Sequence, residues 1–211
     1  MSTGALAVVL YNTPNQFTGL ETIGKIFFIL DLVLFTLFSL TIGARFCLEP
    51  KKLISSIHHP VEGLFFGAYF VSCALILNCM QCYGVPTTGP WLVSALRVLY
   101  WMYSGVVLLA GIFQYFVLFQ KERLHITDAV PAWIFPIYPL LVIGSLAGTI
   151  LPTQPMEAAY PIWVGALMMQ GTAWTIALMQ YSLYTQRLMS SSLPTPSTRP
   201  GMFVPVGPAG R

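Results

Sequence analysis

The feature that most constrains this chain is a series of long segments with almost no charged residue. These segments cover residues 26–44, 63–96, 98–120, 129–156 and 158–186. The charged residue within them is Asp31, and Gly84, Pro86 and Gly89 mark a turn inside the second segment. A helix that crosses a bilayer needs about 20 mostly apolar residues. Each segment is therefore long enough to supply at least one such helix.

The composition of the whole chain agrees with this interpretation. Only 8% of its residues are charged and 56% are hydrophobic, with a mean hydropathy of +0.73. Soluble domains carry about a quarter charged residues, so lipid is expected to be the solvent for much of this surface. The net charge of +3 comes without a basic run, and nothing indicates nucleic-acid binding.

These patterns predict an all-α integral membrane protein with one transmembrane domain over residues 1–211. Complete helices are expected at about 22–46, 61–83, 91–119, 131–151 and 158–186. Residues 1–13 and 200–211 are apolar but too short to span a bilayer. We expect them to be partial helices at the two ends of a truncated bundle, with the five complete helices second to sixth in order.

Lys and Arg residues are distributed unevenly between alternate loops. The turns that follow the first, third and fifth helices contain none of them. The other loops hold Arg45, Lys51, Lys52, Lys121, Arg123, Arg187 and Arg199. Because Lys and Arg are enriched in cytoplasmic loops, we expect the basic loops at 47–60, 120–130 and 187–199 to face the cytoplasm.

No arrangement of residues indicates catalysis or metal binding. The three histidines and four cysteines are scattered, apart from the pair Cys79-x-x-Cys82. A single pair of this kind is a weak signal for zinc or redox chemistry, and small apolar filler is the alternative. No nucleophile, base and orienting group occur together. We therefore expect no metal, no cofactor and no enzymatic activity.

Ionisable groups inside a membrane are costly and indicate function by default. Glu62 follows His59 at the start of the third helix, either as an acid favoured by the helix dipole or as a group at a pore mouth. Arg97 lies about two turns into its helix, where it either extends to the outer surface or contacts an anion. Asp31 is the deepest, and its carboxyl is expected to be protonated or hydrogen-bonded to a neighbouring helix, with a role in proton coupling as the alternative.

Three further patterns concern packing and the surface. Glu21 and Lys25 are four residues apart at a helix end, which predicts a surface ion pair. Small residues four apart let helix backbones approach closely, as in the pairs Gly63-x-x-x-Gly67 and Gly144-x-x-x-Gly148. Prolines interrupt two segments, at Pro131, Pro136, Pro139, Pro205 and Pro208. Each interior proline indicates either a broken helix that lines a pathway or a packing kink.

Five runs of residues resemble a known family. They are MSTGALA at 1–7, HHPVEGLFFG at 58–67, YGVPTTGPWLVSALRVLYW at 83–101, PAWIFPIYP at 131–139 and LPTPSTRPGMFVPVGP at 193–208. In this order they resemble the fungal malic acid permeases of the tellurite-resistance/dicarboxylate transporter family. That family also includes bacterial tellurite-resistance proteins, fungal sulfite pumps and the slow anion channels of plant guard cells.

The resemblance implies a fold of ten helices in five hairpins. Kinked, odd-numbered helices would surround a central pore and even-numbered helices would lie outside. The last three helices of that fold are not expected in this chain, including the ninth, which carries an aromatic gate in channel-type relatives. Residues implied to lie on pore helices are Gly4, Glu62, Phe65, Pro136 and Pro205. Arg97 would lie on a helix of the outer ring. Arg97 and His59 are the other two candidate residues of the substrate pathway.

The function implied by the resemblance is transport of C4-dicarboxylates such as malate through a central helical pore. The expected location of this multi-pass protein is the plasma membrane. The expected partners are the lipid bilayer and a small anionic substrate, with a homo-oligomer left open. A sulfite or small-anion efflux transporter of the same fold is one alternative. Another is a non-transporting membrane partner of a full-length homologue.

Overall fold

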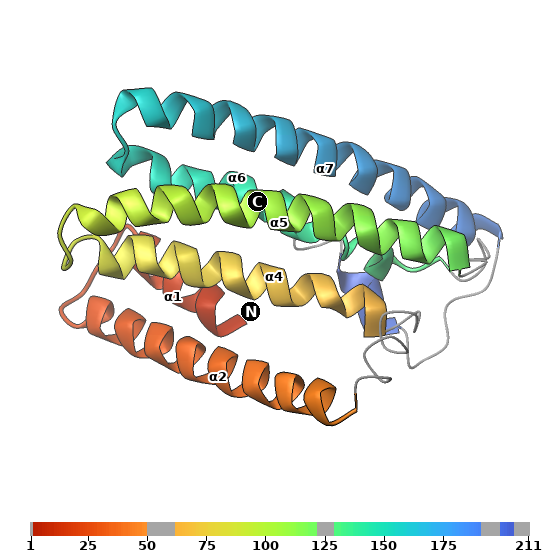
Figure 1. The fold of residues 1–211 in the computed structure, drawn as a ribbon, viewed down its shortest axis with the longest axis horizontal. Helices are drawn as coiled ribbons and strands as arrows, with labels where there is room; N and C mark the ends of the chain where they lie inside the picture. Colours follow the sequence, from red (N-terminus) through yellow and green to blue (C-terminus); the bar gives the residue numbers. More distant parts are fainter. Residues whose placement is uncertain (1, 50–61, 122–128, 191–198, 205–211) are drawn as a thin grey trace.

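The computed structural model describes residues 2–49, 62–121, 129–190 and 199–204. Within these ranges the chain is helical and contains no strand, as expected of an all-α membrane protein. Four helices are long and apolar enough to cross a membrane, and a fifth apolar helix is shorter. Figure 1 shows the long helices running roughly parallel or antiparallel in one bundle.

The first hairpin joins α1 (Ser2–Asn12) to α2 (Leu20–Leu48). α1 ends ahead of Pro14, and the Asn12 and Thr13 side chains donate hydrogen bonds to its last carbonyl groups, on Val8 and Val9. α2 follows Gly19, which has a φ of 108° that favours glycine. α1 lies within the expected range of 1–13, and α2 extends the expected range of 22–46 by two residues at each end.

The second hairpin joins α4 (Glu62–Cys79) to α5 (Trp91–Lys121). α4 continues without interruption into a π-helical turn, η1 (Met80–Gly84). π-helical turns are rare and often occur at functional sites. Sequence periodicity alone does not reveal this turn, which overlaps the end of the helix expected at 61–83.

The span expected as one helix at 131–151 is broken. It consists of a 3₁₀ turn, η3 (Pro131–Ile134), the helix α6 (Tyr138–Ile150) and a second 3₁₀ turn, η4 (Leu151–Thr153). Pro136 and Pro139 cannot donate backbone hydrogen bonds, and a proline ring clashes with the preceding turn. The segment is therefore interrupted, as its prolines indicate, and a shorter helix follows an irregular entrance.

The last long helix is α7 (Met156–Ser190), which begins and ends beyond the expected range of 158–186. A 3₁₀ turn, η5 (Arg199–Phe203), lies where the next helix was expected to start. Arg187 was counted among the loop cations, but it lies inside α7 and is buried. Its guanidinium donates a hydrogen bond to the carbonyl oxygen of Ala129 at 2.8 Å.

Burial divides the helices into an inner and an outer set. The core is centred on α6, whose Leu140, Ile143, Leu146 and Ile150 are almost fully buried. In the most apolar stretch of α4 and η1, 44% of the residues are buried, against 6% in the most apolar stretch of α2. α2, α5 and α7 expose many large apolar side chains, such as Leu40, Leu109 and Met168. These outer faces suit a lipid solvent.

Tyrosine hydroxyls tie the helices together across the bundle. Tyr83 donates to the carbonyl oxygen of Ala7 at 2.7 Å, and Tyr103 donates to that of Phe70 at 3.1 Å. Tyr115 reaches the carbonyl oxygen of Trp133 at 3.1 Å. Because lipid gives apolar faces little reason to associate, such hydrogen bonds and close packing hold membrane bundles together.

The three hairpin turns lie at the same end of the bundle, at the left of Figure 1. They connect α1 to α2, η1 to α5, and η4 to α7. This is the end without Lys or Arg in its turns. The basic loops expected to face the cytoplasm lie mostly outside the described residues, so their side of the membrane stays a prediction.

Candidate functional site

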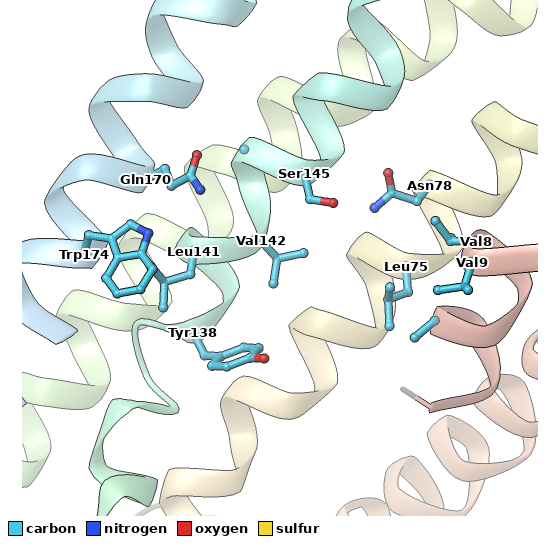
Figure 2. A pocket seen from close by; sticks show the side chains of 12 residues that line it. Val8, Val9, Leu75, Asn78, Tyr138, Leu141, Val142, Ser145, Gln170 and Trp174 are labelled. Atoms are coloured by element: carbon cyan, nitrogen blue, oxygen red, sulfur yellow. The ribbon is translucent and has the colours of Figure 1, made fainter. Parts of the chain in front are cut away.

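A cavity of about 490 Å³ lies between α1, α4, α6 and α7. The first, third and fifth helices of the expected order, which are α1, α4 and α6, thus line one cavity together with α7. Its apolar lining comes from Ala5, Val8, Val9, Leu75, Leu141 and Val142, together with the aromatic rings of Tyr138 and Trp174. Figure 2 shows these side chains spread around the hollow from α1 to α7.

Three uncharged polar side chains line the same cavity, namely Asn78, Ser145 and Gln170. No Asp, Glu, Lys or Arg occurs among the described lining residues. In Figure 2 the Ser145 hydroxyl on α6 points across the hollow toward the Asn78 amide on α4. The cavity therefore offers neutral dipoles rather than a fixed charge.

The Asn78 amide is held in place by α6. The Thr149 hydroxyl, one helical turn beyond Ser145, donates a hydrogen bond to Asn78 Oδ1. Asn78 itself is 1% exposed. Close by, Gln81 in the π-helical turn donates to Thr153 Oγ1 at 3.0 Å. Two hydrogen bonds thus join the end of α4 to the end of α6 beside the cavity.

Asp31 occupies a second polar region, between α1, α2 and α4. It is 4% exposed and accepts a hydrogen bond from Thr3, so the expected bond to a neighbouring helix is confirmed. Its other carboxyl oxygen has no hydrogen-bond partner among the described residues. Asp31 also borders a smaller cavity of about 250 Å³, together with Ser39 and Ser72.

The surroundings of Gly4 explain why α1 carries glycine there. A Cβ atom at Gly4 would lie 2.7 Å from the Asp31 carboxyl and 3.2 Å from the Cβ of Leu75. Three helices therefore meet at a position that has room for no side chain. Gly4 is buried in this contact, and it is absent from the described lining of the large cavity.

The structure places the other candidate residues as follows. Phe65 is half exposed on α4 and packs against the Phe135 ring at a centroid distance of 5.0 Å. Pro136 is buried in the irregular entrance to α6. Arg97 is partly exposed on α5 and makes no hydrogen bond or ion pair within the described ranges. None of the three belongs to the described lining of the large cavity.

Two candidates, His59 and Pro205, lie outside the described residues. α4 begins at Glu62, but the side chain of this residue is also outside the described part of the chain. The role of these three residues stays a prediction. The surface pair is confirmed, since Lys25 Nζ lies 2.8 Å from Glu21 Oε1 and both side chains are largely exposed.

The Cys79-x-x-Cys82 pair behaves as apolar filler. Both thiols are free and buried, in a small cluster with Ala7 and Tyr83. The Cys79 thiol also donates a weak hydrogen bond to the carbonyl oxygen of Gly4, at 3.6 Å. The cysteines thus help to pack α1 against the end of α4.

Sequence reasoning missed the polar residues that line the large cavity. It considered ionisable groups, whereas Asn78, Ser145 and Gln170 are neutral. A signal was available, because an amide within an uncharged, apolar helix needs a hydrogen-bond partner or water. No local pattern indicates that these residues line one cavity, because this depends on how α4, α6 and α7 pack.

Two known proteins similar to this chain are named for the transport of malic acid and the efflux of sulfite. The malic acid transport protein of Schizosaccharomyces pombe is 33% identical over 208 residues, which are 99% of this chain and 48% of that protein. The sulfite efflux pump SSU1 of Arthroderma benhamiae is 30% identical over 213 residues, covering 100% of this chain and 56% of the pump. The chain thus spans about half the length of these curated relatives. No solved structure matches the chain significantly.

The family comparison covers the whole chain. Residues 1–211 match the SLAC1 family, described as voltage-dependent anion channel. The all-helical bundle, the apolar outer faces and the uncharged cavity between inner helices agree with that match. This chain therefore belongs to the SLAC1 family of anion channels and transporters.

Proposed function

We propose that this chain forms part of the pathway by which a C4-dicarboxylate such as malate crosses the plasma membrane. The observation that carries the proposal is the cavity between α1, α4, α6 and α7, with its apolar surface and neutral polar groups. An ion must leave a conducting site as readily as it enters, which requires weak binding. A lining without fixed charge meets this condition. The similarity to a malic acid transport protein supports malate as the substrate.

The lipid-facing surface supports the same proposal. Large apolar side chains on α2, α5 and α7 are exposed on the outside of the bundle, while the cavity lies among the inner segments. Anions would thus be separated from lipid by the outer helices. In a homo-oligomer, a second copy of the chain would pack against these apolar faces of α2, α5 and α7.

Uptake of radiolabelled malate by a permease-deficient yeast tests the proposal. The chain is expressed alone and also fused to the C-terminal half of the S. pombe malic acid transport protein. Ser145→Cys is then treated with a thiol reagent in a background without native cysteine. We expect modification to block malate uptake, because Ser145 is exposed in the cavity.

The control is Leu109→Cys, on the outer face of α5, where the side chain is 68% exposed. Modification there is expected to leave uptake unchanged. Absence of uptake by both the chain and the fusion would refute transport of malate. Equal block at Ser145 and Leu109 would refute the assignment of the pathway to this cavity.

Sulfite efflux is the second candidate, favoured by the 30% identity to a sulfite efflux pump. The same yeast cells distinguish the two candidates. Increased sulfite tolerance without malate uptake would assign the chain to sulfite efflux. Malate uptake without a change in sulfite tolerance supports the first proposal.

A further inference from the structure

The Asn78 amide differs from the buried amides of Gln81 and Gln154 because its oxygen, rather than its nitrogen, takes part in a hydrogen bond. Its oxygen accepts the hydrogen bond from Thr149. Its NH₂ group makes no hydrogen bond to a described residue, and its nitrogen is not among the fully buried polar atoms, so it is accessible from the cavity. A donor in such a position is free to bind water or a ligand. In Figure 2 the amide nitrogen faces the hollow between Asn78 and Ser145.

The hydrogen bond from Thr149 decides which charge the amide favours. An asparagine amide presents an acceptor and donors, so a free amide discriminates poorly between anions and cations. Here Thr149 takes one of the two acceptor positions of the oxygen, whereas both N–H donors remain available to a ligand. The Ser145 hydroxyl, exposed on α6, supplies a further donor on the facing side. The pair therefore presents a surface complementary to an oxyanion.

The position of Asn78 on the helix supports a binding role. It lies two residues before the π-helical turn that begins at Met80. π-helical turns frequently mark functional sites because they disturb the regular hydrogen-bond pattern and redirect side chains. The hydrogen bond from Gln81 to Thr153 fixes this end of α4 against α6. The amide is thus positioned by both helices before any ligand arrives.

We infer that Asn78 and Ser145 form an oxyanion-binding site, in which Thr149 orients the Asn78 amide so that it donates to a carboxylate or sulfite oxygen. This inference deepens the proposed function and rests on it for the choice of ligands. The donors are neutral, so the site selects anions by hydrogen bonding and releases them easily. Thr149 is a positioning residue, since its hydroxyl acts on the ligand through Asn78.

Equilibrium binding to the purified chain in lipid nanodiscs tests the inference without requiring transport. Radiolabelled malate is titrated, and unlabelled sulfite is used as competitor. Asn78→Asp replaces the donor with a carboxylate and is expected to weaken malate binding at least tenfold at pH 7.5. Thr149→Val frees the amide to rotate and is expected to weaken binding about threefold. Asn12→Asp makes the same substitution at the exposed end of α1 and is expected to change affinity less than twofold.

Ser145→Asp keeps the inference testable if the Asn78 variant does not fold, because Ser145 is exposed and tolerates a polar replacement. It is also expected to weaken malate binding at least tenfold. Competition by sulfite extends the site to oxyanions in general, and its absence restricts the site to carboxylates. Unchanged affinity in the folded Asn78 and Ser145 variants, or no anion binding by the wild-type chain, would overturn the inference. If the variants bind malate with unchanged affinity and the yeast cells still take up malate, the proposed function stands and only this site is rejected.

Discussion

Among the described glycines, Gly67 makes the tightest approach to another backbone segment, and its substitution has the clearest expected effect on stability. Gly67 on α4 packs against the backbone at Phe135 and Pro136, where the chain enters α6. A methyl group at Gly67 would lie 2.8 Å from the carbonyl carbon of Phe135 and closer still to its oxygen. Carbon atoms in contact are separated by about 3.5–4.0 Å. Gly67→Ala therefore requires α4 to move away from this segment by about 1 Å.

The expected cost follows from three terms. Overpacking of a tight contact costs about 1–3 kcal/mol. Separation also weakens the neighbouring ring contact between Phe65 and Phe135, worth about 0.5–1.5 kcal/mol. Alanine recovers up to about 1 kcal/mol through its higher helix propensity. The balance is a loss of about 2 kcal/mol in the free energy of unfolding, derived from these terms.

Gly171→Ala is the matched control. Gly171 lies in the middle of α7, and a Cβ atom there would meet nothing within 4 Å. This variant gains helix propensity without a clash, so its stability should be unchanged or slightly raised. The two variants make the same chemical change, and only the tertiary environment differs.

Thermal unfolding of the purified chain in detergent, followed by circular dichroism, measures the difference. A loss of about 2 kcal/mol corresponds to a decrease of about 4–8 °C in apparent melting temperature for a chain of this size. We expect this decrease for Gly67→Ala and none for Gly171→Ala. If Gly67→Ala melts at or above the temperature of the control, the packing of α4 against the entrance to α6 is wrong.

Three further predictions concern the topology, a buried cation and the pore mouth. Single cysteines at Ser56 and Thr88, in a background without native cysteine, should label differently with an impermeant reagent added outside intact cells; preferential reaction at Ser56 would invert the predicted topology. Arg187→Met removes the donor to the Ala129 carbonyl and is expected to lower the free energy of unfolding by about 1–3 kcal/mol in the same melting assay. An unchanged melting temperature would contradict a structural role for Arg187. Glu62→Gln should flatten the dependence of malate flux on pH between about 4.5 and 7.5, where Glu and His titrate, with flux normalised to surface expression; a pH profile identical to that of the wild type would reject gating by Glu62.

The sequence by itself determined the solvent, the class of fold and most of the helices. Uncharged segments of more than 20 residues cannot be accommodated on a soluble surface, and their lengths match a bilayer. The family resemblance also came from local runs of residues. The hydrogen bond to Asp31 could be anticipated because a carboxyl group in an apolar helix needs a partner, although nothing in the sequence indicated that Thr3 supplies it.

Only the tertiary structure decided which residues share a cavity and which glycines are in close contact. The two glycine pairs look alike in sequence, yet a Cβ atom at Gly67 would clash with backbone and one at Gly148 would meet nothing within 4 Å. Likewise, Asn78 and Thr149 are 71 residues apart and meet because α4 packs against α6. Local patterns report a residue's preference for lipid, water or helix. They do not report which other helix faces that residue, because this depends on the shapes and polar groups of all the packed surfaces together.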